Sequence, residues 1–435
     1  MSSSLARNTR INISANVVLG LLGVASGSLV SYRYGAGQRG AIGVAQVLAA
    51  VSASLGAMGL GDAALYMLAK RRDVRLRQLL WYCALAAPLG GLLGAVAGWI
   101  VATVSDDLFP AGTTAFFCGV LGAAGAVFAL LSGAMRGLSD FIGWNILRIA
   151  AAAAWIFALL VRNGSDFDPI GAAVIYAVLM AFICTAQAVR LHSLIKQRAV
   201  TIELGSRPGL RSLLKFGLPS AFASTPLLLN ARLDQVALGL FANQDDVGHY
   251  VAAVGYCWAT VPLGQAIATQ ASARVAATDD RLHEIRRLCR LGAVVILGSG
   301  LLAWLLAPIA IRVLNGTGFE ASVGLSRILL IGTTLQGGTY LLEEISRGLG
   351  SPVAALRAEL SGLISMTLLL IAMAPHGGVP TAIASSIGYL VSAAVAVRAV
   401  SRLMNVPIHG LFGRDRPQAA VAQAARPETP TSDGR

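Results

Sequence analysis

Charged residues are scarce in this sequence. Asp, Glu, Lys and Arg make up 13% of the 435 residues, whereas hydrophobic residues make up 56%. A soluble globular domain carries roughly a quarter charged residues, so this composition excludes most soluble enzymes. The mean hydropathy of +0.69 indicates a chain that lies mostly inside a bilayer.

The residues of the common catalytic and metal sites are also missing. None of the three lysines, Lys70, Lys196 and Lys215, follows a glycine, which excludes nucleotide hydrolysis by a P-loop. The five cysteines are scattered without a CxxC pair, and the five histidines lie far apart. We therefore expect no metal site and no cofactor.

Two weaker patterns remain. Gly35-Ala36-Gly37-Gln38-Arg39-Gly40 matches a dinucleotide motif by its letters, but it lies in a short gap between apolar runs and not after a strand. Asp106-Asp107, Asp166 with Asp168, and Asp245-Asp246 would be the acidic residues of a membrane glycosyltransferase or ligase. Solvated loop ends explain these aspartates equally well, and that enzyme class is disfavoured.

What the chain has in quantity is long apolar runs. A helix of about 20 apolar residues crosses a bilayer, and the sequence contains twelve candidates: 11–31, 42–69, 79–104, 113–135, 142–161, 169–189, 215–241, 249–277, 290–312, 324–345, 355–374 and 379–399. We expect an all-α polytopic membrane protein.

Most of the 34 lysines and arginines fall in every second gap between these runs. Positive loops stay in the cytoplasm, so both termini and the 190–214 gap are expected on that side of a bacterial inner membrane. The net charge of +13 is thus a topology signal, and no compact basic domain is present to bind nucleic acid.

The two halves of the sequence resemble each other. Arg136-Gly137-Leu138 in the first half corresponds to Arg347-Gly348-Leu349 in the second, and the run from Gly40 corresponds to the run from Gly248 at a similar offset. An even number of spans in each half makes the repeat parallel. The predicted architecture is a six-helix bundle at 1–189, a cytoplasmic connector at 190–214, a second bundle at 215–405 and a disordered cytoplasmic tail at 406–435. The two bundles would enclose a V-shaped central cavity, as in a transporter.

Ionisable residues inside spans are costly and usually face a cavity or a partner. The seventh span carries Asn230, Arg232, Asp234 and Gln235. Residues two apart on a helix do not face each other, so Arg232 and Asp234 cannot simply neutralise one another. Two interpretations of this cluster remain open: an interhelical ion pair that holds the bundle, and a site that binds the cargo.

Two further pairs are spaced four residues apart on one helix face: Asn12 with Asn16, and Asp62 with Tyr66. Each pair would line the cavity or bond a neighbouring helix. Arg136, Arg148, Arg274, Glu343, Glu344 and Arg347 lie near cytoplasmic span ends. Contact with lipid headgroups is the default there, and gating or capture of an anionic headgroup is the alternative.

Several stretches together resemble the Wzx-type polysaccharide flippases of the multidrug/oligosaccharidyl-lipid/polysaccharide exporter superfamily. They are Leu213–Pro219, Arg232–Gly239 and Val247–Ala252, with Gly59-Leu60-Gly61, Tyr66, Arg136-Gly137-Leu138 and Asn145 in the first half. The resemblance covers residues 11 to about 405. It implies a two-bundle MATE-like transporter that flips a polyprenyl-pyrophosphate-linked oligosaccharide for surface polysaccharide synthesis, and a cationic cavity. Arg232, Arg33 near the outer mouth and Arg274 near the inner mouth would supply the cations.

The main alternative is a MATE-like, ion-coupled antiporter of drugs or small cations. It would use a membrane carboxylate, and Asp62 and Asp234 are the candidates for H⁺ or Na⁺ coupling in either case. The expected partners are the lipid-linked oligosaccharide, a polysaccharide polymerase and its chain-length machinery, and we expect a monomer.

Overall fold

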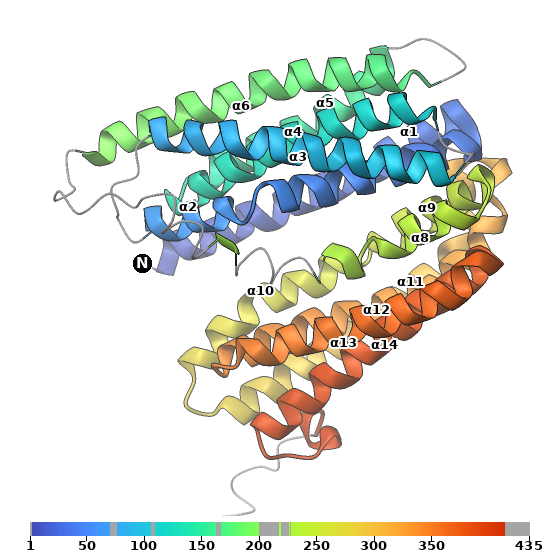
Figure 1. Cartoon of the computed structure of the whole chain (residues 1–435). Helices are drawn as coiled ribbons and strands as arrows, with labels where there is room; N and C mark the ends of the chain where they lie inside the picture. The colour runs from blue at the N-terminus through green and yellow to red at the C-terminus, as the bar shows by residue number, and fades with distance from the viewer. Residues whose placement is uncertain are drawn as a thin grey trace, which may run out of the picture.

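The structure is a computed structural model that describes residues 2–69, 76–105, 109–161, 167–199 and 228–413, together with Gly217, Leu218 and Pro226. Helices account for nearly all of it, and the described part contains no strand. Figure 1 shows two bundles, α1 to α6 and α8 to α14. They meet at the end that holds the α8–α9 and α13–α14 connections, here called the closed end, and diverge at the opposite, open end.

The first bundle contains α1 (Ser2–Gly56), α2 (Leu60–Ala69), α3 (Leu76–Val104), α4 (Ala111–Gly137), α5 (Phe141–Val161) and α6 (Pro169–Ala199). The second contains α8 (Leu233–Phe241), α9 (Gln244–Trp258), α10 (Val261–Ala277), α11 (Arg281–Asn315), α12 (Ala321–Gly348), α13 (Pro352–Met373) and α14 (Gly378–Leu403). Short 3₁₀ helices lie at η1 (Thr317–Phe319), η2 (Ala374–His376) and η3 (Ile408–Leu411).

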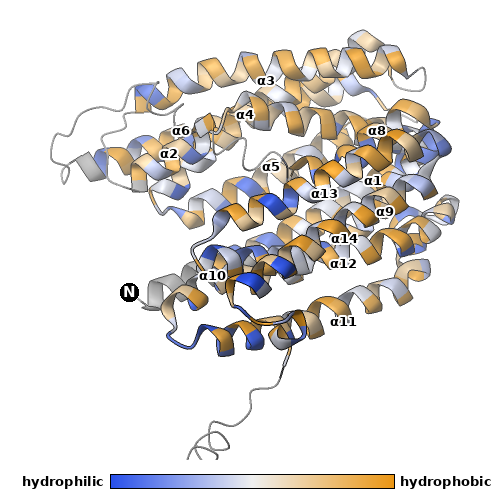
Figure 2. Ribbon diagram, turned by 60° about the horizontal axis from the view of Figure 1, so that its bottom comes forward, coloured by the Kyte–Doolittle hydropathy of each residue, from blue (hydrophilic) through white to orange (hydrophobic). Residues whose placement is uncertain are grey.

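Eight of the described helices are long and apolar enough to cross a membrane, and the bent pair α9–α10 makes a ninth. Figure 2 shows hydrophobic residues along most of the helices. Phe182, Val294 and Ile371 are 69–73% exposed. An apolar exterior of this extent suits lipid, so the chain is a multi-pass membrane protein.

The count differs from twelve partly because α1 contains two helices that are counted as one span. They join at Gly35, where φ is 74° and ψ is −174°, and the chain folds back there, since Arg39 lies against Gly27. The predicted gap at 32–41 is thus a tight turn at one residue. α12 falls outside the eight, since it carries Arg327, Glu343 and Glu344 among many small polar residues. Ten of the 27 residues of the predicted span 215–241 lie outside the described residues.

The buried cores show how the two bundles are joined. One core at the closed end is shared by both bundles, with Val30, Tyr34 and Phe117 from the first and Tyr250 and Leu329 from the second. Toward the open end each bundle has its own core. Burial of apolar area stabilises by roughly 25 cal/mol per Å², so the shared core holds the bundles together at the closed end.

Glycines allow α1 and α9 to approach closely at the closed end. A Cβ on Gly248 would overlap the carbonyl oxygen of Ala36, and a Cβ on Gly40 would overlap that of Gln244. Gly37 lies against Gln244 and Asp245. The dinucleotide-like spacing at residues 35–40 is therefore a bend and a helix-packing surface.

The internal repeat has the same local geometry in both halves. α4 and α12 end on Leu138 and Leu349, with φ −84° and −80°, and a residue of positive φ follows each, Ser139 at 63° and Gly350 at 82°. The same turn hydrogen bonds close both helices. Equal helix ends at equivalent positions support a duplicated six-helix unit.

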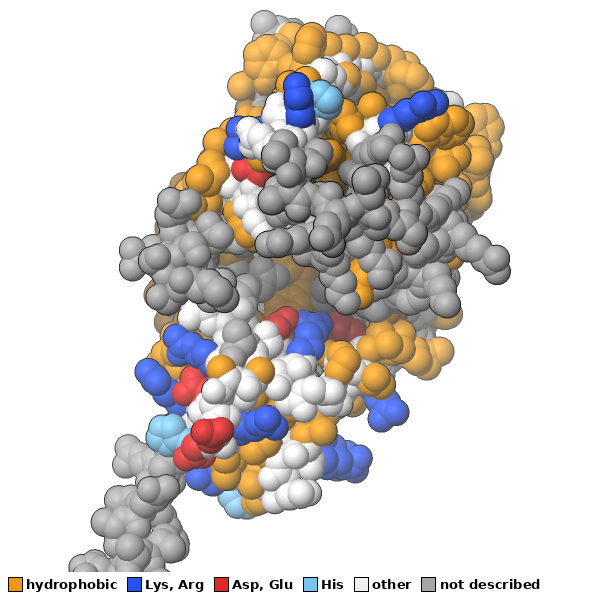
Figure 3. Space-filling model, turned by 90° about the vertical axis from the view of Figure 1, so that its left-hand side faces the viewer, with side chains coloured by type: hydrophobic (Ala, Val, Ile, Leu, Met, Phe, Trp, Pro, Cys, Tyr) orange, Lys and Arg blue, Asp and Glu red, His pale blue; other side chains and the backbone are white. Residues whose placement is uncertain are grey.

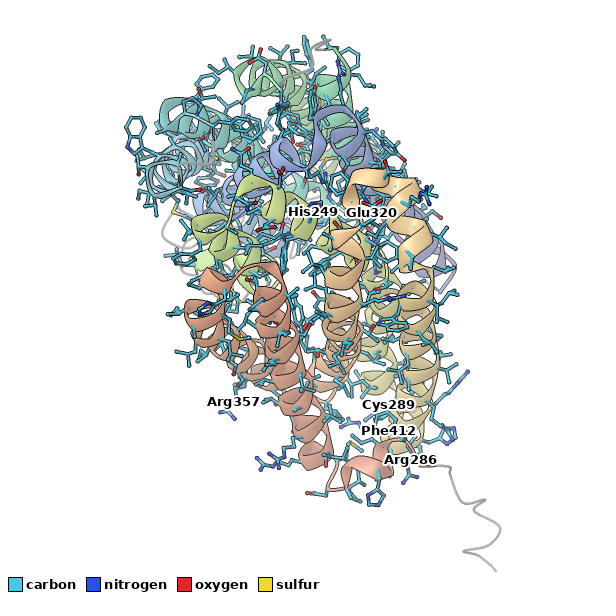
Figure 4. The ribbon with its side chains drawn as sticks, turned by 90° about the vertical axis from the view of Figure 1, so that its right-hand side faces the viewer. His249, Arg286, Cys289, Glu320, Arg357 and Phe412 are labelled. Atoms are coloured by element: carbon cyan, nitrogen blue, oxygen red, sulfur yellow. The ribbon has the colours of Figure 1, made fainter. Side chains whose placement is uncertain are left out.

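Two expected boundaries change. α6 continues through the predicted start of the connector at residue 190 to Ala199, because Leu191, Leu194 and Ile195 pack on the core of the first bundle. Residues 200–214 lie outside the described part. The tail predicted as disordered from 406 is ordered up to residue 413: Leu411 of η3 is buried, and Arg286 donates to the carbonyl of Gly410 at 2.9 Å. Figure 4 shows Arg286 of α11 and Phe412, which follows η3, next to each other.

Candidate functional site

A cavity of about 730 Å³ lies between the two bundles. Its walls come from α1, α8, α9, α10 and α11, from Asn315 near the closed end to Asn16 and Leu263 toward the open end. Figure 3, which looks at the open end, shows the molecule hollowed between the bundles. A volume of this size accommodates a headgroup or a small ligand.

Both halves of α1 present one helical face to this cavity. Asn16, Gly20, Gly23 and Gly27 line it from the first half. Arg39, Gly43, Gln46 and Ala50 line it from the second half. Spacings of three and four residues place side chains on one side of a helix, and the small residues leave room for a ligand.

Arg39 was not predicted as a site residue. It lies in the part of α1 that the sequence indicated as a loop, and helix formation beyond Gly35 carries its side chain into the cavity. Its guanidinium lies against Gly27 and Gly255. Its Nε is buried and has no hydrogen-bond partner among the described residues, so it retains donors for a ligand.

Arg232 immediately precedes α8 and lines the same cavity. Its Cζ lies 5.9 Å from the centre of the Trp258 ring. Gly255, beside Arg39, and Trp258, beside Arg232, are three residues apart on α9 and share one face. The two guanidinium groups therefore approach neighbouring turns of the same helix.

The remaining polar lining is neutral. It consists of Asn16, Ser26, Ser28, Gln46, Gln235, Tyr256, Trp258 and Asn315. Among the described residues that line the cavity, Arg39 and Arg232 are charged and none is acidic. Two cations without a carboxylate in a partly dehydrated space attract an anion.

Asp234 points away from the cavity into the second bundle, where it is 2% exposed. Its carboxylate accepts hydrogen bonds from Tyr250 Oη at 2.6 Å, Ser385 Oγ at 2.9 Å and the backbone N–H of Gln235 at 2.8 Å. These three donors satisfy a buried carboxylate. Arg232 and Asp234 thus have different surroundings, as their spacing requires.

Asn230 also lies inside the second bundle and does not line the cavity. Its Nδ2 donates to Glu359 Oε2 at 2.9 Å, and Gln336 Nε2 donates to the other oxygen of Glu359 at 2.9 Å. Tyr389 donates to the carbonyl of Asn230 at 3.0 Å. No pattern in the sequence indicated Glu359, because a single acidic residue near a span end gives no spacing signal.

Two of the predicted cavity arginines lie elsewhere. Arg33 donates from Nη1 to the carbonyl of Leu159 at 2.8 Å. It lies against α5 and is not part of the cavity lining. Arg274 is exposed on α10, with Gln270 at 3.0 Å and Glu284 at 3.6 Å. Neither residue lines the cavity.

The remaining predicted residues gather at the open end of the first bundle. Asn12 accepts a hydrogen bond from Asn145 at 2.7 Å, whereas Asn16 both lines the cavity and accepts from Arg148 at 3.3 Å. Asp62 lies 3.5 Å from Arg136. Tyr66 packs at the edge of the first bundle's own core.

Comparison with protein-family models and with the sequences of characterised proteins gives no match. Solved structures do match. The lipid II flippase MurJ in an inward closed conformation is similar, with a TM-score of 0.73 and 11% identity, over 92% of this chain and 89% of MurJ. The fold is that of MurJ and the MATE transporters.

Two MATE structures extend the comparison. An inward-facing MATE family multidrug resistance transporter of the MOP superfamily gives a TM-score of 0.59 at 14% identity, over 89% of this chain and 96% of that protein. The MATE multidrug transporter DinF-BH gives a TM-score of 0.61 at 17% identity, over 94% of this chain and 96% of that protein. At these identities the likeness establishes the shared fold.

Proposed function

We propose that this protein is a flippase that moves a polyprenyl-pyrophosphate-linked oligosaccharide across the bacterial inner membrane by alternating access, for the synthesis of a surface polysaccharide. The observation that carries the proposal is the charge of the cavity. Arg39 and Arg232 line it, and no acidic residue does so among the described residues. A guanidinium presents several donors in a planar fork that matches phosphate oxygens.

The size of the cavity fits part of such a cargo. About 730 Å³ accommodates the diphosphate and the first sugars, whose hydroxyls can bond the neutral amides and serines of the lining. The polyprenyl chain is apolar and would remain in the lipid, outside the protein. The small residues of α1 would let the glycan pass between the bundles.

The alternative is a MATE-like antiporter of cationic drugs. A cationic cargo favours a carboxylate or an aromatic-rich wall, and the described lining offers two arginines instead. The fold is common to both classes of transporter, so the charge of the cavity separates them. An enzymatic role as glycosyltransferase or ligase has no support in this cavity.

Deletion of the gene tests the cargo. We expect loss of one surface glycan and accumulation of its lipid-linked repeat units on the cytoplasmic side, since the polymerase and the chain-length machinery would be left without substrate. Complementation with the intact gene restores the polymer. Unchanged polymer together with sensitivity to cationic dyes would support the antiporter instead.

The proposed orientation places the open end in the cytoplasm. The first turns of α3 and α11 and the last turns of α10 and α14 lie at that end, and each carries an arginine: Arg77, Arg281, Arg274 and Arg402. Positive segments are retained inside. A periplasm-active reporter fused after Lys196 or at the C-terminus is expected to be silent. The same reporter fused after Thr317 in η1 should be active, and the opposite pattern would reverse the orientation.

We also propose that Asp234 carries the coupling ion, H⁺ or Na⁺, in preference to Asp62, which is paired with Arg136. Asp234 lies two residues from Arg232, so its charge acts on the helix that forms the cavity wall. Asp234→Asn keeps the shape and removes the charge. We expect transport in vesicles to continue along the cargo gradient but to lose its response to an ion gradient. An unaltered ion response would exclude Asp234.

A further inference from the structure

A second group of arginines lies outside the cavity, at the open end of the first bundle. Arg148 Cζ is 4.4 Å and Arg136 Cζ is 5.5 Å from the centre of the Trp144 ring. We call Arg136, Trp144 and Arg148 the Trp144 site. Stacking on an aromatic face holds a guanidinium plane in one orientation, so both cations are prearranged.

The Trp144 site has an excess of positive charge. Asp62 lies 3.5 Å from Arg136. The other carboxylate of this region, Asp140 in the α4–α5 turn, is held by two hydrogen bonds from Arg190, at 2.8 and 3.2 Å. Burial alone would raise the pKa of Asp140, but these bonds outweigh burial and lower it, so this carboxylate stays committed to Arg190. Two guanidinium groups therefore face one carboxylate.

Both arginines retain unused donors. Arg148 donates to the side-chain oxygens of Asn145 at 3.1 Å and Asn16 at 3.3 Å, which uses two of the five N–H groups of a guanidinium. The Nε of Arg136 is buried and has no hydrogen-bond partner among the described residues. A buried donor of this kind is costly to leave unpaired, and an anion would satisfy it.

The internal repeat provides a comparison within the chain. Arg347 is the counterpart of Arg136, and it is paired with Glu343 at 3.4 Å and with Glu344. The positions equivalent to those two glutamates are Ser132 and Gly133 in the first half. Gly133 packs against Gly61 so closely that no side chain fits. The charge of Arg347 is neutralised inside the protein, whereas that of the Trp144 site is not.

The position of the Trp144 site connects lipid to the cavity. On α5, Ile142 and Ile146 are 47% and 59% exposed on the surface that faces lipid. On α1, Asn16 bonds Arg148 and also lines the cavity. A group bound here would touch both the membrane and the cavity mouth.

We infer that the Trp144 site binds the phosphate of a membrane lipid at the cytoplasmic boundary. Lipid phosphate carries the charge and the acceptor oxygens that two prearranged guanidiniums recognise. The phosphate belongs either to the lipid-linked cargo before it enters the cavity or to a resident anionic phospholipid. Binding of the cargo's phosphate at this site rests on the proposed function, whereas binding of a lipid phosphate as such does not.

Direct binding tests the inference. The full-length protein in neutral phosphatidylcholine nanodiscs would be titrated with farnesyl pyrophosphate, a short polyprenyl diphosphate, and separately with phosphatidylglycerol. Arg136→Gln with Arg148→Gln is expected to lower the affinity for at least one probe by tenfold or more. The matched control is Arg347→Gln, the counterpart arginine, which should bind both probes as the unaltered protein does.

The outcomes of these titrations distinguish the two possible sources of the bound phosphate. Loss of farnesyl pyrophosphate binding alone identifies cargo phosphate, and loss of both probes identifies a general lipid-phosphate site. Unchanged affinity for both, in a double variant that keeps its thermal stability, overturns the inference. If the glutamine variant is unstable, Arg136→Lys with Arg148→Lys decides, because the charge is retained while the fork geometry is lost and the affinity should fall by a smaller factor.

The same variants distinguish this inference from the proposed function. If the glutamine variant loses lipid binding but the protein exports cationic drugs, the Trp144 site is confirmed and the proposed flippase function is rejected. If instead the glutamine variant makes the surface glycan normally and its affinity for both probes is also unchanged, the inference fails and the flippase proposal stands.

Discussion

Alanine at Arg39 or at Arg232 is expected to lower the rate of transport roughly ten- to a hundredfold and to leave the amount of inserted protein unchanged. A hydrogen bond to a charged group contributes about 1.5–3 kcal/mol, and 1.4 kcal/mol corresponds to a factor of ten. Both residues line the cavity. Transport would be followed by the appearance of the lipid-linked oligosaccharide on the outer face of cells or vesicles.

Further variants identify the cause of the loss. Arg232→Lys should keep part of the activity, because a point charge replaces a planar fork. Arg357→Ala is the matched control, since Arg357 is on α13 and projects away from the bundle (Figure 4). If Arg232→Ala lowers the abundance of the protein and a simultaneous Asp234→Ala restores it, the pair is structural and Arg232 has no cargo role.

Alanine at Gly248 is expected to shift the protein from the conformation described here toward one that opens at the closed end. Its Cβ would overlap the carbonyl oxygen of Ala36. Overpacking typically costs about 1–3 kcal/mol, which corresponds to a shift in population of roughly five- to 150-fold. The contact lies between the two bundles, so separation of α1 from α9 relieves it.

A cysteine at Ser31 would report this shift. Ser31 is 3% exposed and its hydroxyl donates across the bundles to Asn315 at 2.8 Å. With the five native cysteines replaced, Ser31→Cys should react with an impermeant maleimide roughly fivefold faster or more in the Gly248→Ala background. Gly298→Ala is the control, because its Cβ meets nothing within 4 Å. Equal labelling in both backgrounds would contradict the prediction.

Much of the fold was predictable, because bilayer solvation leaves a strong imprint on sequence. The apolar runs of α3 to α6 and α11, α13 and α14 give span lengths directly, and Arg136-Gly137-Leu138 with Arg347-Gly348-Leu349 indicated the duplication. The shortness of the turn within α1 was not predictable from hydropathy. Residues 32–41 were expected to form a gap, whereas all of them except Gly35 are helical: Arg33 bonds α5, Gly37 and Gly40 pack on α9, and Arg39 lines the cavity.

The candidate site was also predicted only in part, because the residues between the first two apolar runs were expected to form a loop. Arg232, Gln235 and Asn16 line the cavity, but Arg39 was assigned to a loop and overlooked. The spacing of Arg39, Gly43, Gln46 and Ala50 is a helical face and would have identified it. The partners of Asp234 and Asn230, which are Tyr250, Ser385 and Glu359, come from other helices. No pattern in a single sequence specifies such contacts.

The meeting of Gly40 and Gly248 has a consequence for the ancestry of the protein. These glycines occupy equivalent places in the two halves, and a Cβ on Gly40 would lie 2.8 Å from the backbone nitrogen of Gly248. In a two-fold dimer of an unduplicated six-helix unit, one glycine would have met its own copy in a self-complementary contact. Fusion of two such genes would have allowed each half to change alone. The two halves have matching glycines where α1 meets α9, whereas Arg136 and Arg347 have different surroundings.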